Sequence, residues 1–219
     1  MSIIKRNIMG DTVSRKLRKA IITGKYPDRY HLAEPVLAEE WGMSRGPIRD
    51  ALQLLVREGF AERLSNGRVC VRKFDEQDIR NLFEFRYMLE SFSVIRWIAN
   101  PSELFAMNEF MMILANMRDL TISTDEFSQW DMLFHRSIVS LSANKSLIQS
   151  WNGLEDVIMS ILEITNKGNP RSDQIIDHHQ SILTAIQEHN ADKACALIKM
   201  HLDEAEQVMI TNLKELLAT

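Results

Sequence analysis

VLAEEWGMSRGPIRDALQLLVREGF, residues Val36 to Phe60, has the pattern of two short helices joined by a tight turn. Gly42 supplies a residue that tolerates a left-handed turn, and Ser44 is placed to cap a second helix that runs to about Glu58. A buried face at helical spacing follows in that helix, formed by Ile48, Ala51, Leu52, Leu55 and Val56. The stretch therefore predicts a helix-turn-helix.

Arg45 and Arg49 lie one turn apart on the opposite side of the second helix. Two arginines at the exposed start of such a helix suit guanine edges and phosphates. We therefore interpret the helix pair as a DNA-reading unit.

The flanking residues complete a winged helix-turn-helix. Thr12 is placed to cap a preceding helix from Val13 to about Thr23, in which Arg15, Lys16, Arg18 and Lys19 face water. After the second helix, predicted strands 61–65 and 68–73 flank Asn66-Gly67, a strong hairpin signal. Arg68 lies beside the hairpin tip, where it either meets the minor groove or phosphates or is a solvated turn residue.

The chain from residue 75 onward has a different character. Asp75 is placed to cap a new helix, and periodic apolar segments follow at 79–98, 104–120, 124–141, 145–165, 171–188 and 191–217. We predict a mainly α protein with a winged helix-turn-helix domain over residues 1–74 and an all-α bundle of about six helices over 75–219.

Charge separates the same two regions. Residues 1–74 hold 15 Lys plus Arg against 8 Asp plus Glu, and the remainder holds 11 against 22. A basic head on an acidic body predicts different partners for the two. Two cysteines are too few for a disulfide framework or a zinc finger, and no apolar run or N-terminal signal predicts membrane insertion or export. We expect a soluble, cytoplasmic protein.

Three histidines and an aspartate are predicted to point into the bundle from three helices. Asp131 and His135 lie four residues apart on an apolar face, while His179 and His201 each share an apolar stripe. A lone histidine on such a stripe is usually a satisfied core residue, and an Asp-His pair at this spacing is more often a surface ion pair. Burying all four groups together is costly unless something shared satisfies them, and a divalent metal does so.

The sequence resembles the GntR superfamily of bacterial transcription regulators, in its FadR-like branch with an FCD effector domain. The winged head of that superfamily is similar to three stretches: LRKAIITGKY, VLAEEWGMSRGPIRDALQLLVREGFAERL and NGRVCVR. The first FCD helix is similar to FRYMLE, and the last two FCD helices are similar to HQSILTAIQEHNADKACALIKMHL. The resemblance implies that Arg45 and Arg49 read bases or phosphates and that Ser44 and Gly67 touch the DNA backbone. Gly46 stands where threonine is common and His31 where arginine is usual. These two departures bear on which half-site is read and leave the docking mode intact.

The resemblance also implies a function for the bundle. The matching FCD subgroup holds a metal through an Asp-x3-His, His, His set, which corresponds to the four residues above, and this donor set suits Zn, Ni, Fe or Mn. Arg86 resembles the family arginine that faces this cavity, and because a guanidinium can form two hydrogen bonds to a carboxylate, we expect Arg86 to bind the effector. The alternative for Arg86 is a helix-surface ion pair with Glu90, four residues on.

These observations predict a repressor that binds a pseudo-palindromic double-stranded DNA operator as a homodimer. A small organic acid bound at the metal is expected to modulate DNA binding. The rival classes are a metal-dependent hydrolase, which does not need a basic head, and a structural or dimerisation protein stapled by a metal.

Overall fold

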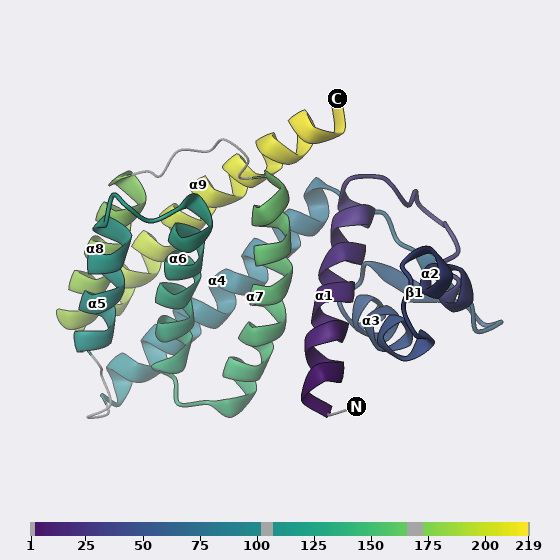
Figure 1. Ribbon diagram of the computed structural model, residues 1–219. Coiled ribbons are helices and arrows are strands. Elements are labelled where there is room, and N and C mark those ends of the chain that lie inside the picture. The colour runs from purple at the N-terminus through teal and green to yellow at the C-terminus, as the bar shows by residue number, and fades with distance from the viewer. Residues whose placement is uncertain (1–2, 102–106, 166–172, 219) are drawn as a thin grey trace. The chain divides into compact units, whose positions relative to one another are not determined.

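The computed structural model describes residues 3–101, 107–165 and 173–218, which divide into two compact units. Unit 1 comprises residues 1–76 with 214–219, and unit 2 comprises 77–213. The described elements, in order, are α1 (Ile3–Ile22), α2 (Glu34–Glu40), α3 (Arg45–Arg57), β1 (Ala61–Arg63), β2 (Val69–Val71), α4 (Glu76–Ala99), α5 (Met107–Arg118), α6 (Thr124–Ser140), α7 (Lys145–Thr165), α8 (Asp173–Gln187) and α9 (Ala191–Ala218) (Figure 1). The fold is mainly α, as predicted.

The core of unit 1 lies between α1 and α3. Leu17 of α1 and Ile48 and Leu55 of α3 are fully buried there. The predicted start of the first helix was wrong: α1 begins at Ile3, and Thr12 lies inside it rather than at its N-cap. No proline interrupts the residues before Thr12, so nothing in the local sequence stops the helix there.

Arg18 corrects a second prediction for the same helix. Its side chain does not face water but is buried against Glu58, at the end of α3. Arg18 Nε donates to Glu58 Oε2 at 2.7 Å and Nη2 donates to Oε1 at 2.6 Å. This bidentate pair fixes the side of α1 against the C-terminal end of the predicted recognition helix.

The turn between α2 and α3 has the expected glycine conformation. Gly42 adopts φ +61°, and the N–H of Met43 donates to the carbonyl oxygen of Ala38 at 2.9 Å, which closes the end of α2. Ser44 occupies the N-cap position of α3, but its side chain makes no capping hydrogen bond. The predicted N-cap position is therefore confirmed, but the predicted side-chain hydrogen bond from the cap is absent.

The wing is a short antiparallel hairpin. Ala61 pairs with Val71 and Arg63 with Val69, so both strands are shorter than predicted. The connector before α2 also joins this sheet, because Leu32 N–H donates to the carbonyl oxygen of Val69 at 2.9 Å and Val71 N–H donates to that of Tyr30.

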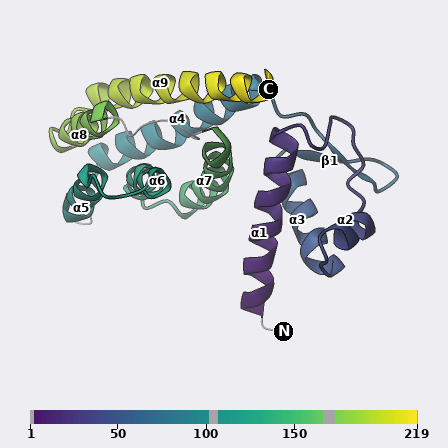
Figure 2. The same cartoon turned by 45° about the horizontal axis from the view of Figure 1, so that its top comes forward.

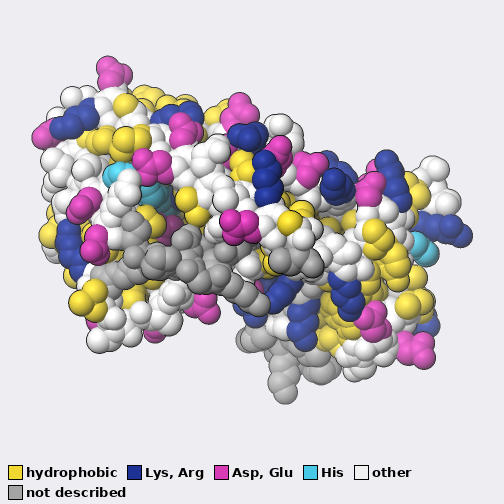
Figure 3. All heavy atoms as spheres, turned by 90° about the horizontal axis from the view of Figure 1, so that it is seen from above, with side chains coloured by type: hydrophobic (Ala, Val, Ile, Leu, Met, Phe, Trp, Pro, Cys, Tyr) yellow, Lys and Arg dark blue, Asp and Glu magenta, His cyan; other side chains and the backbone are white. Residues whose placement is uncertain are grey.

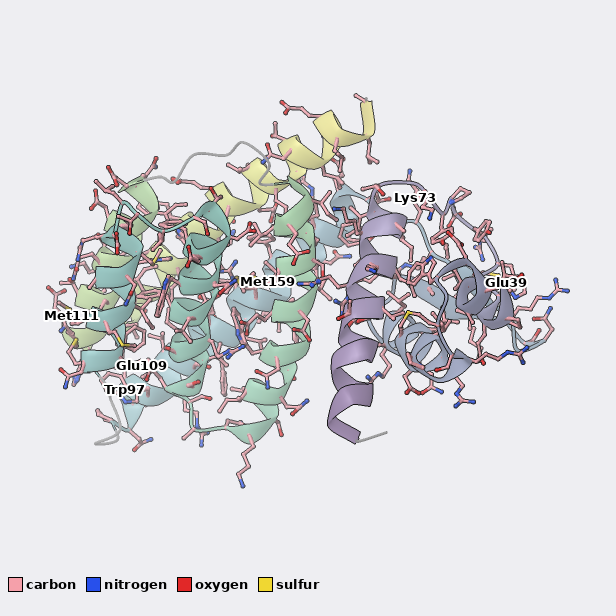
Figure 4. The ribbon with its side chains drawn as sticks, viewed as in Figure 1. Glu39, Lys73, Trp97, Glu109, Met111 and Met159 are labelled. Carbon is pink, nitrogen blue, oxygen red and sulfur yellow. The ribbon has the colours of Figure 1, made fainter. Side chains whose placement is uncertain are left out.

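Unit 2 is a helical bundle, as predicted. Figures 1 and 2 show α5, α6 and α7 side by side, with α4 and α9 running together across another face of the unit. Two side-chain contacts show that α4 and α9 are antiparallel. Arg80 forms an ion pair with Glu206 at 3.0 Å, and further along α4 the ring of Tyr87 lies under Lys199, which comes earlier in α9. Side chains fill the space between these helices, while Met111 extends from α5 and is exposed (Figure 4).

The helix boundaries in unit 2 follow capping and break signals. Ser123 and Glu126 form a reciprocal capping box at the start of α6. The predicted helix starts at Leu104 and Arg171 and the break at 168–170 lie outside the described residues. None of the described helices is long and apolar enough to cross a membrane.

Candidate DNA interface and metal centre

The two arginines singled out on α3 are exposed at its N-terminal end. Arg45 is the first residue of the helix and Arg49 follows one turn later, while Pro47 and Ile48 between them are buried. The buried residues fix the helix against unit 1, so the two guanidinium groups share the outer face. Gly46, in the same turn, has no heavy atom within 4 Å of the position of a Cβ, so packing within the head does not require glycine there.

The tip of the wing presents a second exposed polar segment. Gly67 adopts φ +82°, which a residue with a side chain rarely does, and Arg68 beside it is exposed. The tip is held by Arg63, whose Nη1 donates to the Gly67 carbonyl oxygen at 3.3 Å, and by Asn66, whose Oδ1 accepts from Arg68 N–H. Lysine and arginine side chains are prominent on the visible face of this unit (Figure 3).

The four predicted metal ligands converge in unit 2. Asp131 and His135 come from α6, His179 from α8 and His201 from α9, and their ligand atoms all lie within 4.8 Å of one another. His135 Nε2 is 3.1 Å from His201 Nε2 and 3.2 Å from His179 Nε2, and the last two atoms are 3.3 Å apart. Asp131 Oδ1 lies 3.3 Å from His179 Nε2. Three imidazoles thus direct the same ring atom to one point.

Burial sets the protonation state of the cluster. Removal from water lowers the pKa of His135, His179 and His201 well below the ordinary histidine value, and the Arg86 guanidinium lowers each further. The same burial raises the pKa of the Asp131 carboxyl to about 6, against the opposing charge of Arg86. Because 18% of the Asp131 side chain is still accessible, water also reaches this carboxyl and opposes that rise. The imidazoles are therefore neutral at physiological pH, the form that ligates metals.

Arg86 and Glu90 adjoin the cluster from α4. Arg86 Nε donates to Glu90 Oε1 at 2.8 Å, so the expected pair exists, but both side chains are buried rather than on the surface. The other oxygen, Glu90 Oε2, lies 2.7 Å from His135 Nδ1. Arg86 Nη2 is buried and has no hydrogen-bond partner among the residues that the structure describes. Burial raises the pKa of Glu90, and the Arg86 charge opposes that rise.

Aromatic rings enclose the same group of side chains. Phe134 stacks on His179 with ring centroids 4.1 Å apart, and Arg86 lies over the Phe83 and Trp151 rings at 5.5 and 5.8 Å. Apolar walls strengthen the electrostatic interactions of the buried charges by excluding water.

The structure shows which neighbouring residues belong to the cluster and which do not. His178 is not among the four converging residues; its Nδ1 faces Glu204 Oε2 at 3.7 Å. Sequence reasoning missed Glu90 as part of the site, although its four-residue spacing from Arg86 put both on one helical face. No pattern in the sequence pairs Glu90 with His135, which lies 45 residues later.

A helix-turn-helix with a wing, joined to a helical domain, defines the class of DNA-binding transcription regulators. The chain belongs to the GntR family of bacterial regulatory proteins: residues 9–71 match that family and residues 81–204 match the FCD domain. It is therefore a transcription regulator and not an enzyme, so the hydrolase alternative was wrong.

Characterised relatives span most of the chain. It is 28% identical over 213 residues to the gluconate operon transcriptional repressor of Bacillus licheniformis, covering 93% of this chain and 86% of that protein. It is 23% identical over 197 residues to the transcriptional repressor GlaR of Escherichia coli, covering 86% and 90%.

Solved structures share the fold. Lar, which controls expression of the Listeria monocytogenes agr system, aligns with a TM-score of 0.69 at 18% identity, covering 91% of this chain and 95% of that one. A metal-free FCD domain, that of TM0439, aligns with a TM-score of 0.54 at 22% identity, covering 66% and 99%.

Proposed function

We propose that this chain is a transcriptional repressor whose operator binding responds to a small organic acid held at a divalent metal in unit 2. The observation that carries the proposal is the convergence of four ligand atoms, from Asp131, His135, His179 and His201, at one buried point.

The donor set fits a metal ion. Ligand atoms that share one ion at bond lengths of about 2.1 Å lie roughly 3.0 to 3.4 Å apart, and the three Nε2 atoms are separated by 3.1 to 3.3 Å. His179 directs Nε2 at the Nε2 atoms of His135 and His201, and its Nδ1 has no hydrogen-bond partner among the described residues. Three imidazoles and one carboxylate suit Zn, Ni, Fe or Mn.

The neighbouring Arg86 supports an anionic effector. When bound, the metal supplies a Lewis-acidic centre that attracts carboxylate oxygens. Arg86 keeps one buried nitrogen, Nη2, without a partner among the described residues, and a guanidinium donates readily to a carboxylate. We therefore assign a small organic acid as the effector, with Arg86 as its charge partner.

Exposed arginines support the DNA-binding role of unit 1. Arg45 and Arg49 present two guanidinium groups from the start of α3, and Arg68 presents a third from the wing. We assign base or phosphate contacts to these three, and backbone contacts to Ser44 and Gly67. Gly46 lies between the two α3 arginines, where the absent side chain affects which bases they reach.

A homodimer supplies two heads for a pseudo-palindromic operator. The described surface of unit 2 offers a matching feature on α4, where an apolar stripe at spacings of three, four and three residues is 41 to 59% exposed; it consists of Phe85, Met88, Phe92 and Ile95. Spacing of this kind forms a helix-to-helix seam. The repressor names of the two relatives support repression as the outcome, and a role on DNA agrees with the expected bacterial cytoplasm.

Metal content tests the site. Wild-type protein is expected to bind one divalent ion, and His201→Ala is expected to lose it together with any melting-temperature rise produced by small carboxylic acids. His178→Ala is the matched control, since that neighbouring histidine lies outside the cluster and its variant should retain the metal. Full metal content in His201→Ala, measured by elemental analysis, contradicts the assignment.

Operator selection tests the regulatory role. Full-length protein incubated with random double-stranded DNA is expected to enrich one short pseudo-palindromic sequence. Enrichment of no sequence, with binding that depends on salt alone, would contradict the proposed operator recognition.

A further inference from the structure

Glu90 is not one of the four proposed metal ligands, yet it contacts one of them. Its side chain is completely buried, and its two carboxylate oxygens contact two different partners. Oε1 accepts from Arg86 Nε at 2.8 Å within α4, and Oε2 lies 2.7 Å from His135 Nδ1 on α6. One carboxylate therefore bridges a proposed metal ligand and the proposed effector arginine.

The contact with His135 decides which ring nitrogen carries the proton. Glu90 Oε1 already accepts from Arg86 Nε, and Oε2 faces His135 Nδ1, whereas His135 Nε2 faces the Nε2 atoms of His179 and His201. A ring nitrogen that binds a metal must offer its lone pair, so with Nε2 directed into the cluster the ring hydrogen lies on Nδ1, where Glu90 Oε2 accepts it. A neutral imidazole protonated at Nδ1 has its lone pair at Nε2, the atom that faces His179 and His201.

The contact with Arg86 orients the second group. Glu90 uses Nε of the guanidinium, and Nη2 remains without a partner among the described residues. Because Glu90 holds only the Nε edge of the guanidinium, Nη2 can donate to an anion. The contact also restricts the Arg86 side chain before the anion binds, so binding costs less conformational entropy.

We propose that Glu90 is a positioning residue that presents His135 Nε2 to the metal and Arg86 Nη2 to the effector acid. This inference rests on the proposed metal and effector site. Because both contacts share one carboxylate, loss of Glu90 weakens the two ligands together. Carboxylates hydrogen-bonded to metal-ligating imidazoles typically contribute about 10- to 100-fold in metal affinity.

The variant that tests the inference is Glu90→Gln, which keeps the size of the side chain but removes its charge. Zn²⁺ titration against a chromophoric chelator is expected to give a dissociation constant about 10- to 100-fold higher than in wild type. Glu84→Gln, an exposed substitution on the same helix, is the matched control and should bind Zn²⁺ as wild type does. Glu90→Asp retains the charge and is expected to recover part of the affinity.

A measurement on the wild-type protein keeps the inference testable if Glu90→Gln fails to fold. Nitrogen-15 NMR of the metal-free full-length chain is expected to find the His135 proton on Nδ1. A proton on Nε2 overturns the inference, as does unchanged Zn²⁺ affinity in folded Glu90→Gln.

The two proposals fail in different ways. Wild-type protein that takes up none of Zn²⁺, Ni²⁺, Fe²⁺ and Mn²⁺ overturns both the metal site and the role of Glu90. Wild-type protein that binds Zn²⁺ through His201, with unchanged affinity in Glu90→Gln, overturns the role of Glu90 alone.

Discussion

At the scale of single residues, charge and exposure divide the arginines of this protein into two kinds. Arg45, Arg49 and Arg68 are exposed in unit 1, where a guanidinium is free to meet a nucleic acid. Arg18 and Arg86 are buried, and each is held by a glutamate within 2.9 Å. Arginine is therefore exposed in the proposed DNA-contacting positions and buried against a glutamate inside each unit.

Replacing Arg49 by alanine is expected to weaken binding to the selected operator by about 1 to 3 kcal/mol and to relax base preference at one position. The reason is the loss of a guanidinium that donates to a base edge. Fluorescence anisotropy with labelled operator measures the loss. Arg57→Ala, at the opposite end of α3, is the control and is expected to retain specificity; an unchanged binding curve for Arg49→Ala contradicts the role.

At the scale of elements, α3 is positioned by contacts at both ends of its buried face. Ile48 packs near its start, and Glu58, directly after its last residue, receives the bidentate contact from Arg18. In unit 2, by contrast, α6 is fixed at its start by a reciprocal capping box, and its later turns carry Asp131 and His135. The candidate residues on α3 and α6 thus stand on helices that have an end held by side-chain contacts.

Breaking the buried pair in unit 1 is expected to cost more than breaking an exposed one. Glu58→Ala leaves the Arg18 charge buried without its carboxylate, and about 3 to 5 kcal/mol of the free energy of unfolding should be lost. Urea denaturation of the head transition measures this. Glu40→Ala removes an exposed partner of Lys25 and should cost far less; equal losses in the two variants contradict the distinction.

The capping box of α6 predicts a pH dependence. The backbone N–H and hydroxyl of Ser123 lower the pKa of Glu126 below its ordinary value. The stabilisation is therefore complete above the unfolded pKa and is lost as the pH falls through the folded pKa. The stability difference between wild type and Glu126→Gln, measured by thermal denaturation, is expected to shrink from pH 7 to pH 3. Asp125→Asn, beside the capping pair, should not reproduce that trend.

At the scale of the whole molecule, a basic head and an acidic helical unit divide the work of one regulator. The excess of Lys and Arg over Asp and Glu lies before residue 75 and the reverse excess lies after it. DNA attracts the first region through its phosphates, whereas the acidic second region is repelled by them. The proposed organic acid would change DNA affinity only through its differential affinity for two arrangements of the chain.

The exposed stripe on α4 predicts the assembly. Phe92→Glu places a charge in the centre of the proposed seam and is expected to weaken dimerisation by about 2 kcal/mol or more, with a parallel loss of operator affinity. Sedimentation equilibrium measures the dimer constant. Leu120→Glu, at an exposed apolar residue away from the stripe, should remain dimeric; a Phe92→Glu dimer as stable as wild type argues against this surface.

Local sequence patterns indicated the fold class and put each member of the candidate cluster on an apolar helix face. Helical periodicity indicated the apolar faces, Gly42 and Gly67 marked the turns, and the spacing of Asp131 from His135 put both on one face. These features are local, because they depend on residues within one or two turns of each other.

Only the tertiary structure decided the contacts that link distant segments. It paired Arg18 with Glu58, joined the connector at Tyr30 and Leu32 to the wing, and brought Glu90 to His135. The physical reason is that the environment of a charged side chain depends on which helices meet, and periodicity within one helix does not specify its partner. The sequence alone therefore determined which residues are candidates, and packing decided which of their atoms face one another.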